Sequence, residues 1–252
     1  MKNVGDPPFV SASQIAQRTC ALAIMTKAPV SGQVKTRLTP PLTPAEAAQL
    51  NRCFIQDTAR ILGKVGLGSE GVVCFTPPGA EHLYSTLIPH SFRLLPQRGE
   101  TLGDRVRSAF EDLFMSGFDA VCLIGSDSPT VPLTTYVRAI EILGSSDNVA
   151  VVGPADDGGY YLIGLAEPHP QLFDGVNWST VRVLDQTLAR AAELRLNVEM
   201  LPPHYDVDDD ESLARLSDEL LLDPSAQSKS ELAPATAAFL GQLTKRYGTF
   251  RN

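Results

Sequence analysis

The sequence predicts an α/β protein whose sheet is mixed but mainly parallel, with helices on both faces. Apolar runs of strand length, such as 20–25 and 120–125, alternate with segments that repeat apolar residues at helical spacing. This alternation is typical of parallel strands joined by crossover helices. The exception is the turn at 156–159, which separates the apolar runs 149–153 and 160–165 with no helix between them. It predicts a hairpin-like insertion, and therefore a mixed sheet.

The strongest helix signal begins at Thr43. Pro44 follows at the first helical position and Glu46 stands three residues after Thr43, which together form a capping box. Asp208 is expected to cap a later helix in the same way, with Glu211 three residues on. The buried face of the first helix is expected to comprise Ala47, Leu50, Phe54, Thr58 and Ile61. Other helices are expected at about 79–87, from within 97–105 to 115, at 132–143, at 178–194 and at 235–246. Other strands are expected at 71–76, 91–95 and 197–201.

The length of 252 residues suits one α/β domain with an appendage. A hydrophobic fraction of 43% and a charged fraction of 20% are ordinary for a globular protein with a sizeable core. Residues 1–19 are expected to form a loosely held arm, and residues 20–222 the main domain. Residues 223–234 are poor in apolar side chains, so 223–252 is expected to be a linker followed by a final amphipathic helix.

Charge and hydropathy exclude several classes of protein. The net charge of −8 argues against a general nucleic-acid binder. No apolar run has the length of a membrane span, and the N-terminus lacks the apolar core of a signal peptide. Cys20, Cys53, Cys74 and Cys122 form no CxxC pair and are interpreted as core residues in a reducing compartment. A cytoplasmic protein is therefore expected, and no pattern indicates an oligomeric state.

Three cations follow the first buried strand. Lys27, Lys35 and Arg37 lie in the loop after 20–25, where ligands of open α/β sheets bind. They are candidates for binding a polyphosphate, and a solvated surface is the other interpretation. The loop matches neither GxGxxG nor GxxxxGK[ST], so a dinucleotide fold and a P-loop are not supported. The side chains, rather than backbone amides alone, would have to bind the phosphates.

Two acidic signals suggest a site for a hard cation. Asp127 follows the apolar strand 120–125 within Gly-Ser-Asp-Ser-Pro, where it could bind Mg²⁺ or Mn²⁺ or simply cap the next helix. In an extended segment Asp206 and Asp208 would point to the same side and could share one cation. Asp208 could instead serve only as a cap. Facing the three cations, Asp127 and Asp208 would neutralise a diphosphate from both sides.

Two further segments are candidates for contacts with substrates. Asp156 and Asp157 form a turn that is followed at once by Tyr160 and Tyr161, which suits an acceptor pocket as well as ordinary turn chemistry. The Gly-containing segment 97–105 could hydrogen-bond a nucleobase or be only a loop.

Five segments together resemble a bacterial family of GT-A-fold transferases. They are KAPVSGQVKTRL at 27–38, QRGETLGDRVRSAF at 97–110, IGSDSPTVP at 124–132, GPADDGGYYLIGL at 153–165 and DVDDDESL at 206–213. The family is the nucleotide-diphospho-sugar transferase-like group, which includes the arsenosugar-biosynthesis-type (radical-SAM/selenodomain-associated) glycosyltransferases. The lysine spacing and KTRL also look like those of 2-phospholactate guanylyltransferases. The acidic segment is similar to DxDTPEDL of sugar nucleotidyltransferases, although Asp209-Asp210 replace Thr-Pro.

The resemblance implies a GT-A (nucleotide-diphospho-sugar transferase) fold with a nucleotide over the first strand and a divalent metal, Mg²⁺ or Mn²⁺. The expected reaction moves a sugar from a nucleotide-sugar to a small-molecule acceptor. One alternative is nucleotidyl transfer from an NTP to a phosphorylated small molecule, with release of pyrophosphate. Another is a non-catalytic nucleotide-binding partner of a pathway enzyme.

The candidate site residues fall into four groups. Catalytic roles are expected of Lys35, Arg37, Asp127 and Asp157. Nucleotide binding is expected of Lys27, Lys35, Arg37, Gln97, Gly103, Arg105, Ser126 and Asp127. The metal is expected on Asp127 and Asp208, and the acceptor on Asp156, Asp157, Gly158, Gly159 and Tyr160.

Overall fold

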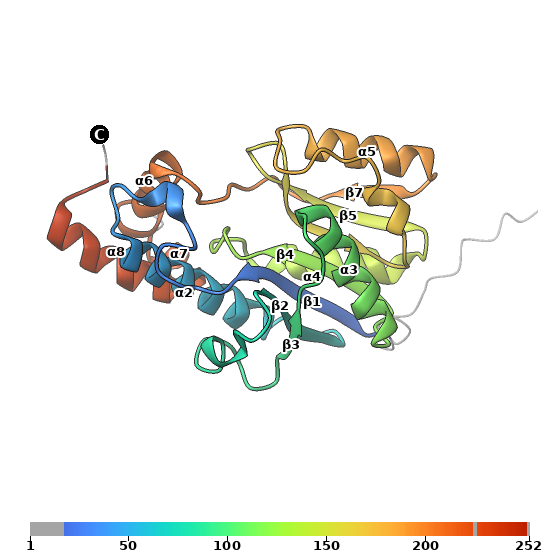
Figure 1. The fold of residues 1–252 in the computed structure, drawn as a ribbon, viewed down its shortest axis with the longest axis horizontal. Coiled ribbons are helices and arrows are strands. Elements are labelled where there is room, and N and C mark those ends of the chain that lie inside the picture. Colours follow the sequence, from blue (N-terminus) through green and yellow to red (C-terminus); the bar gives the residue numbers. More distant parts are fainter. Residues whose placement is uncertain (1–17, 224–225, 251–252) are drawn as a thin grey trace, which may run out of the picture.

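A mixed seven-stranded sheet forms the centre of the protein in the computed structural model, which describes residues 18–223 and 226–250 (Figure 1). The strands are β1 (Cys20–Lys27), β2 (Ser69–Thr76), β3 (Arg93–Pro96), β4 (Ala120–Gly125), β5 (Val149–Pro154), β6 (Tyr160–Leu165) and β7 (Asn197–Met200). Their order is β3-β2-β1-β4-β6-β5-β7. β6 is antiparallel to β4 and β5, and the other neighbours are parallel. The predicted hairpin and the mainly parallel sheet are both confirmed.

Helices cover both faces of the sheet. They are α2 (Pro44–Leu62), α3 (Leu102–Met115), α4 (Leu133–Ser145), α5 (Val183–Glu193), α6 (Asp210–Leu221), α7 (Ala226–Leu232) and α8 (Pro234–Tyr247), with short 3₁₀ helices η1 (Thr36–Leu38), η2 (Glu81–Leu83) and η3 (Pro170–Phe173). The carboxyl-terminal half of α2 and helix α4 pack on one face, and α3, α5 and η3 pack on the other. In the described residues, no helix is both long enough and apolar enough to cross a bilayer.

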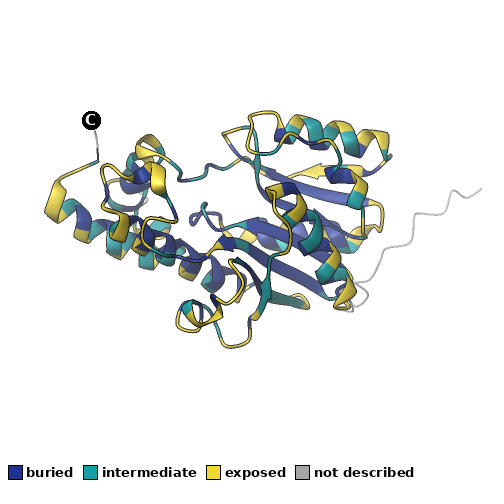
Figure 2. Ribbon diagram, in the orientation of Figure 1, coloured by how far each residue is buried: buried dark blue, intermediate teal, exposed yellow. Residues whose placement is uncertain are grey.

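The central strands are buried on both sides, which explains their unbroken apolar sequences. In β1, Leu22 and Ile24 face α2 and α4, whereas Ala21 and Ala23 face α3. All four are fully buried, and Figure 2 shows the same burial along the middle of the sheet. The four cysteines are free and buried, as predicted for core residues.

A third hydrophobic cluster lies beyond the carboxyl end of β1. It joins η1, the amino-terminal half of α2, and helices α6 and α8, with Leu38, Phe54, Val207, Leu213 and Leu240 in its centre. Figure 1 shows α6, α7 and α8 gathered at this end of the molecule. Helix α8 at about 235–246 is confirmed, and it packs on α2 as part of this cluster.

Four local predictions differ from the structure. The helix expected at 79–87 is a single 3₁₀ turn, because so short a segment has few residues to offset helix nucleation. The helix expected from 178 begins at Val183, after Ser179 adopts a positive φ of 60°. The linker expected at 223–234 contains helix α7. Apart from these differences, residues 1–17 of the expected N-terminal arm lie outside the described residues.

The fourth difference concerns the cap of α6. Asp209, not Asp208, caps this helix, and its side chain accepts a hydrogen bond from the Ser212 amide. Ser212, rather than Glu211, completes the capping box. Asp208 is therefore left outside the helix, with its carboxylate available to the neighbouring loop.

Candidate active site

A cavity of about 340 Å³ opens at the carboxyl ends of β1, β2 and β4, and we call it the strand-end cavity. Each of these strands runs in the same direction, so the residues that follow them meet at one edge of the sheet. The predicted site residues that line it are Lys27, Lys35, Arg37, Gln97, Arg105, Ser126, Asp127 and Asp208. The structure thus brings the loop cations together with both expected metal ligands.

Lys35 is more buried than the other two cations of the loop. It has a left-handed backbone conformation (φ 50°) before η1, and its side chain is only 5% exposed. The ammonium donates to Asp127 Oδ2 at 2.9 Å, to Asp208 Oδ1 at 2.9 Å and to the Val207 carbonyl at 2.8 Å. Because an ammonium has three N–H groups, all its donors are engaged. Burial lowers the pKa of Lys35, but the charges of Asp127 and Asp208 outweigh burial and raise this pKa above its ordinary value.

The two carboxylates belong to distant parts of the chain that lie side by side. The Val207 amide donates to the Asp127 carbonyl at 3.0 Å, which joins the segment before α6 to the end of β4. Asp127 Oδ1 also accepts the Ser126 hydroxyl at 3.0 Å. Asp208 Oδ2 lies 3.3 Å from Arg37 Nη2, whose side chain is 75% exposed. Arg37 can therefore reorient toward a ligand with less loss of contact than Lys35.

Asp206 is a partly buried carboxylate next to this pair. It accepts the Ser128 hydroxyl, and the intervening Val207 is fully buried, so Asp206 and Asp208 share the cavity side as predicted. Burial raises the pKa of Asp206 to about 6; the Ser128 hydrogen bond opposes this rise, and the charges of Asp127, Asp157 and Asp208 add to it. Asp206 therefore lies among three other carboxylates.

The donor set is consistent with a hard divalent cation held by few protein ligands. Across residues 18–223 and 226–250, no cluster of three or more His, Cys, Asp or Glu has the arrangement of a metal site. Asp127 and Asp208 instead form a pair that shares one internal cation, Lys35. Mg²⁺ is commonly bound by one or two carboxylates and completed by phosphate oxygens and water. These two residues are the ones that could hold it.

A second cavity of about 500 Å³ adjoins the first, and we call it the turn cavity. Both cavities are lined by Arg37 and Asp208, and the turn cavity also has Asp156 and Asp157 in its wall. Asp157 Oδ1 accepts the Gly159 amide at 2.8 Å, which is ordinary turn chemistry. Two of the predicted acceptor residues therefore line a cavity next to the cation loop.

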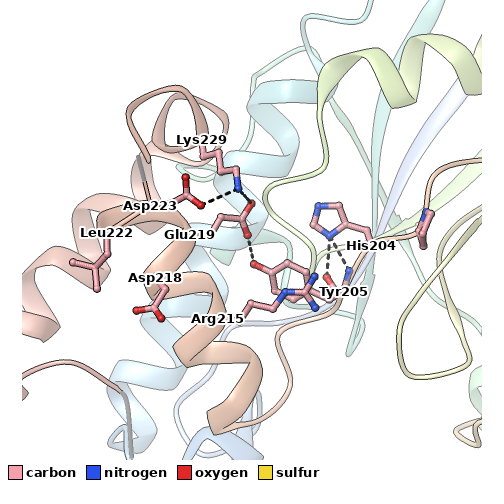
Figure 3. A pocket seen from close by; sticks show the side chains of 9 residues that line it. His204, Tyr205, Arg215, Asp218, Glu219, Leu222, Asp223 and Lys229 are labelled. Carbon is pink, nitrogen blue, oxygen red and sulfur yellow. Dashed lines mark hydrogen bonds and ion pairs between the residues drawn. The ribbon is translucent and has the colours of Figure 1, made fainter. Parts of the chain in front are cut away.

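Arg215 of α6 holds Asp156 in place. Arg215 Nη1 lies 2.8 Å from Asp156 Oδ2. Its guanidinium lies over the ring of Tyr205, 3.7 Å from the ring centre (Figure 3). A third cavity, of about 800 Å³, shares Arg215 and Tyr205 with the turn cavity. Its lysine, Lys229, is paired with Glu219 at 3.7 Å, so this cation is neutralised within the protein.

Three predicted residues have structural contacts that differ from their expected roles. Gln97 donates its amide to the carbonyls of Cys74 at 2.7 Å and Thr26 at 3.2 Å, and so joins β2 to β1. A Cβ on Gly103 would lie 2.2 Å from Trp178 Nε1, so this glycine serves the packing of an indole and does not line the strand-end cavity. The ring of Tyr160 packs edge-on against Trp178, with its hydroxyl buried, and does not line the turn cavity.

The glycines of the acceptor turn serve its backbone. Gly158 has a φ of 86°, and a Cβ there would lie 2.2 Å from the Val181 carbonyl oxygen. Gly159 donates its amide to Asp157 within the turn. Both positions therefore keep Asp156 and Asp157 at the cavity wall rather than offering side-chain contacts.

Comparison with known proteins gives the family. A profile described as "Uncharacterized protein conserved in bacteria (DUF2064)" matches residues 66–180. The crystal structure of a "putative nucleotide-diphospho-sugar transferase" from Desulfovibrio desulfuricans G20 is 33% identical, with a TM-score of 0.74, over 89% of this chain and 97% of that chain. The chain belongs to this nucleotide-diphospho-sugar transferase-like family. The resemblance carried by the five segments and the predicted GT-A fold are confirmed.

More distant structures share the fold of this nucleotide-diphospho-sugar transferase-like protein. CMP:2-keto-3-deoxy-manno-octonic acid synthetase in complex with CTP is 12% identical, with a TM-score of 0.51 over 79% of this chain and 96% of that chain. A nucleotidyl transferase from Methanothermobacter thermautotrophicus is 12% identical, with a TM-score of 0.54 over 81% and 97%. No curated protein matches the sequence. Family membership makes the chain a nucleotide-dependent transferase, an enzyme rather than a non-catalytic partner.

Three residues of this site were not anticipated from the sequence. Arg215 carries no sequence signal that separates it from other helix-surface arginines. Ser128 stands next to Asp127, but only the fold shows that it bonds Asp206. Asn51 lines the strand-end cavity and is 4% exposed. The sequence does contain a signal for Asn51. Positions 47, 51, 54 and 58 follow helical spacing, so Asn51 is a polar amide on a face that is predicted to be buried.

Proposed function

We propose that this transferase moves a glycosyl group from a nucleotide-sugar to a small-molecule acceptor, with Mg²⁺ or Mn²⁺ as cofactor. The observation that carries the proposal is the junction of the two cavities at Arg37 and Asp208. A donor whose diphosphate lies among the cations of the strand-end cavity would direct its sugar toward this junction. The acceptor would then approach from the turn cavity, on the side of Asp157.

The cations of the loop stabilise the leaving nucleoside diphosphate in this proposal. Lys27 and Arg37 are exposed at the cavity and bind phosphate oxygens as negative charge develops on them. Lys35 holds Asp127 and Asp208 close together before the metal binds. Mg²⁺ or Mn²⁺, when held by these two carboxylates, supplies Lewis acidity at the diphosphate.

The acceptor is activated from the turn cavity. Asp157 is the proposed general base, because its carboxylate borders the cavity and has no cationic partner among the described residues. Asp156 is less suited, because Arg215 neutralises it at 2.8 Å. The acceptor hydroxyl gives its proton to Asp157, its oxygen bonds to the anomeric carbon, and the bond from that carbon to the diphosphate breaks.

Nucleotidyl transfer is the second candidate, and one observation favours it. Strand β4 ends at Gly125 and is followed by Asp127 and then Ser128, whose hydroxyl is bonded to Asp206. The strand end therefore presents one carboxylate where the DxD motif of typical glycosyltransferases has two. The fold is shared with a synthetase that was crystallised with CTP. In this reaction a phosphate oxygen of the acceptor attacks the α-phosphorus of an NTP, and pyrophosphate leaves.

One experiment separates the two candidates. The protein is incubated with each common nucleotide-sugar and each NTP, with Mg²⁺ or Mn²⁺ and a panel of hydroxylated and phosphorylated small molecules. Free nucleoside diphosphate that appears together with a glycosylated product would support glycosyl transfer. Pyrophosphate released from an NTP would contradict glycosyl transfer and support nucleotidyl transfer. If neither product forms with any pair, the proposal is wrong.

A further inference from the structure

Asn51 is a buried polar residue whose side-chain oxygen has no hydrogen-bond partner among the described residues. It lies on α2, is 4% exposed and lines the strand-end cavity. Its Oδ1 atom is buried and accepts no hydrogen bond from any residue of 18–223 or 226–250. Buried side-chain amides are nearly always paired, since leaving one unpaired costs stability. An amide that is unpaired at a cavity wall is therefore a candidate for pairing with a ligand.

Asn51 stands at the cation end of the cavity. Phe54 follows it by three residues, so the two side chains are neighbours on the same helix face. The Lys35 ammonium lies 5.7 Å from the Phe54 ring centre. Asn51 thus lines the same cavity as Lys35, whose three N–H groups are already used within the protein.

The second cavity-lining amide provides a contrast. Gln97 donates to the carbonyls of Cys74 and Thr26, so its amide joins two strands. Asn51 makes no such contact, although it is more deeply buried than Gln97. The amide of Gln97 thus has a structural role, whereas the side-chain oxygen of Asn51 is unpaired among the described residues.

We propose that Asn51 is a binding residue for the nucleoside diphosphate part of the donor. Its NH₂ group donates to a phosphate oxygen, and its oxygen accepts a hydroxyl of the same ligand. An amide supplies both kinds of group, and a nucleoside diphosphate presents acceptors on its phosphates and donors on its ribose. This inference rests on the proposed function and adds to it a contact that neither the loop nor the carboxylates provide.

The test compares Asn51→Leu with a matched control on the same helix. Thr58 is also on α2 and is 2% exposed, and its buried hydroxyl has no partner in the described part of the chain, but it does not line the cavity. Binding of ADP, CDP, GDP and UDP is measured by calorimetry with Mg²⁺ present, and the tightest binder of the wild type is used for both variants. Thermal unfolding without ligand is measured in parallel.

Asn51→Leu is expected to weaken binding of the nucleoside diphosphate about 10- to 100-fold, as for loss of a hydrogen bond to a charged group. Binding of the corresponding nucleoside should change less. Ligand-free thermal stability should be equal or higher, because an apolar side chain of similar size replaces an unpaired amide. Thr58→Val should leave nucleotide binding unchanged.

Wild-type affinity in Asn51→Leu would overturn the inference. A loss of affinity that is accompanied by a large loss of ligand-free stability would also overturn it, because it would show a structural role. If the wild type binds none of the four nucleoside diphosphates, the proposed function fails, and this inference fails with it. Failure of the proposed function can be told from failure of this inference alone, because in the latter case the wild type binds a nucleoside diphosphate and Asn51→Leu binds it equally well.

Discussion

Lys35 Nζ lies 2.9 Å from Asp127 Oδ2, in a contact that joins the loop after β1 to the end of β4. The same ammonium lies 2.9 Å from Asp208 Oδ1, so one buried cation bridges both carboxylates. A divalent cation on Asp127 and Asp208 would compete with Lys35 for the same oxygen atoms. We therefore expect metal binding to release Lys35 from at least one carboxylate and to make an N–H group available for a phosphate.

Lys35→Met should tighten Mn²⁺ binding in the absence of nucleotide. The variant leaves two neighbouring carboxylates without their shared cation, and such a pair attracts a divalent ion more strongly. We expect the dissociation constant for Mn²⁺ to fall about tenfold, measured by calorimetry or by the loss of the free Mn²⁺ resonance signal.

Lys27→Met is the control for this experiment. Lys27 lines the same cavity, but it forms no ion pair among the described residues. Its variant should bind Mn²⁺ like the wild type when no nucleotide is present. Unchanged or weaker Mn²⁺ binding in Lys35→Met would contradict the view that Lys35 and the metal compete.

Asp127→Asn should lower the metal-dependent transfer rate about 100-fold or more, as for loss of one electrostatic stabiliser of a transition state. The change is isosteric, and an asparagine oxygen can still accept the Ser126 hydroxyl. Steady-state rates over a range of Mg²⁺ concentrations provide the measurement. Asp185→Asn, an exposed residue on α5, serves as the control and should have the wild-type rate. Metal-dependent turnover that survives in Asp127→Asn would remove Asp127 from the mechanism.

The sheet could be predicted from the sequence because its strands are buried on both faces. Residues on both sides of β1 are fully buried, so their apolar run is continuous and easily recognised. Asp127 could be identified for a related reason, since it is the first charged residue after the apolar run of β4. Both signals are local in sequence.

The rest of the site depends on contacts that are distant in sequence. Asp208 and Asp209 are equally good caps by composition, and the choice follows from Lys35, 173 residues away, which binds Asp208. The sequence suggests that Gly103 belongs to a nucleotide-binding loop. In the structure a glycine is needed there because any side chain would collide with Trp178. Helix α7 has no fully buried residue, so no apolar periodicity marked it.

Asp206→Asn should stabilise the metal-free protein above pH 6. The pKa of Asp206 in the folded protein is about 6, above its ordinary value of 3.8. Its contribution to stability is therefore fully present below about pH 3.8 and is lost as the pH rises through 6. At pH 7.5 the variant should gain about 1–2 kcal/mol, allowing for partial exposure, and at pH 4 it should equal the wild type. Urea unfolding with EDTA at both pH values tests this, and an equal gain at pH 4 would contradict it.

Asp57→Ala should destabilise the packing of α8 on α2. Asp57 is 1% exposed, and its carboxylate accepts the Ala235 amide at 3.0 Å, the Thr236 amide at 2.8 Å and the Thr236 hydroxyl at 2.8 Å. Burial raises the pKa of this carboxyl, while the three hydrogen bonds lower it in part. Removing the acceptor leaves three donors unpaired at the start of α8, which should cost about 2–4 kcal/mol.

Thermal and urea unfolding of Asp57→Ala and Thr236→Val together test this role. Thr236→Val removes only the hydroxyl donor and keeps both amide bonds, so it should cost about 1 kcal/mol. Because α8 shares its hydrophobic cluster with η1 and the start of α2, the larger loss should also weaken nucleotide binding at Lys35 and Asn51. Equal stabilities of the two variants would show that the carboxylate does not hold α8, and wild-type stability of both would show that the helix is held by its apolar contacts alone.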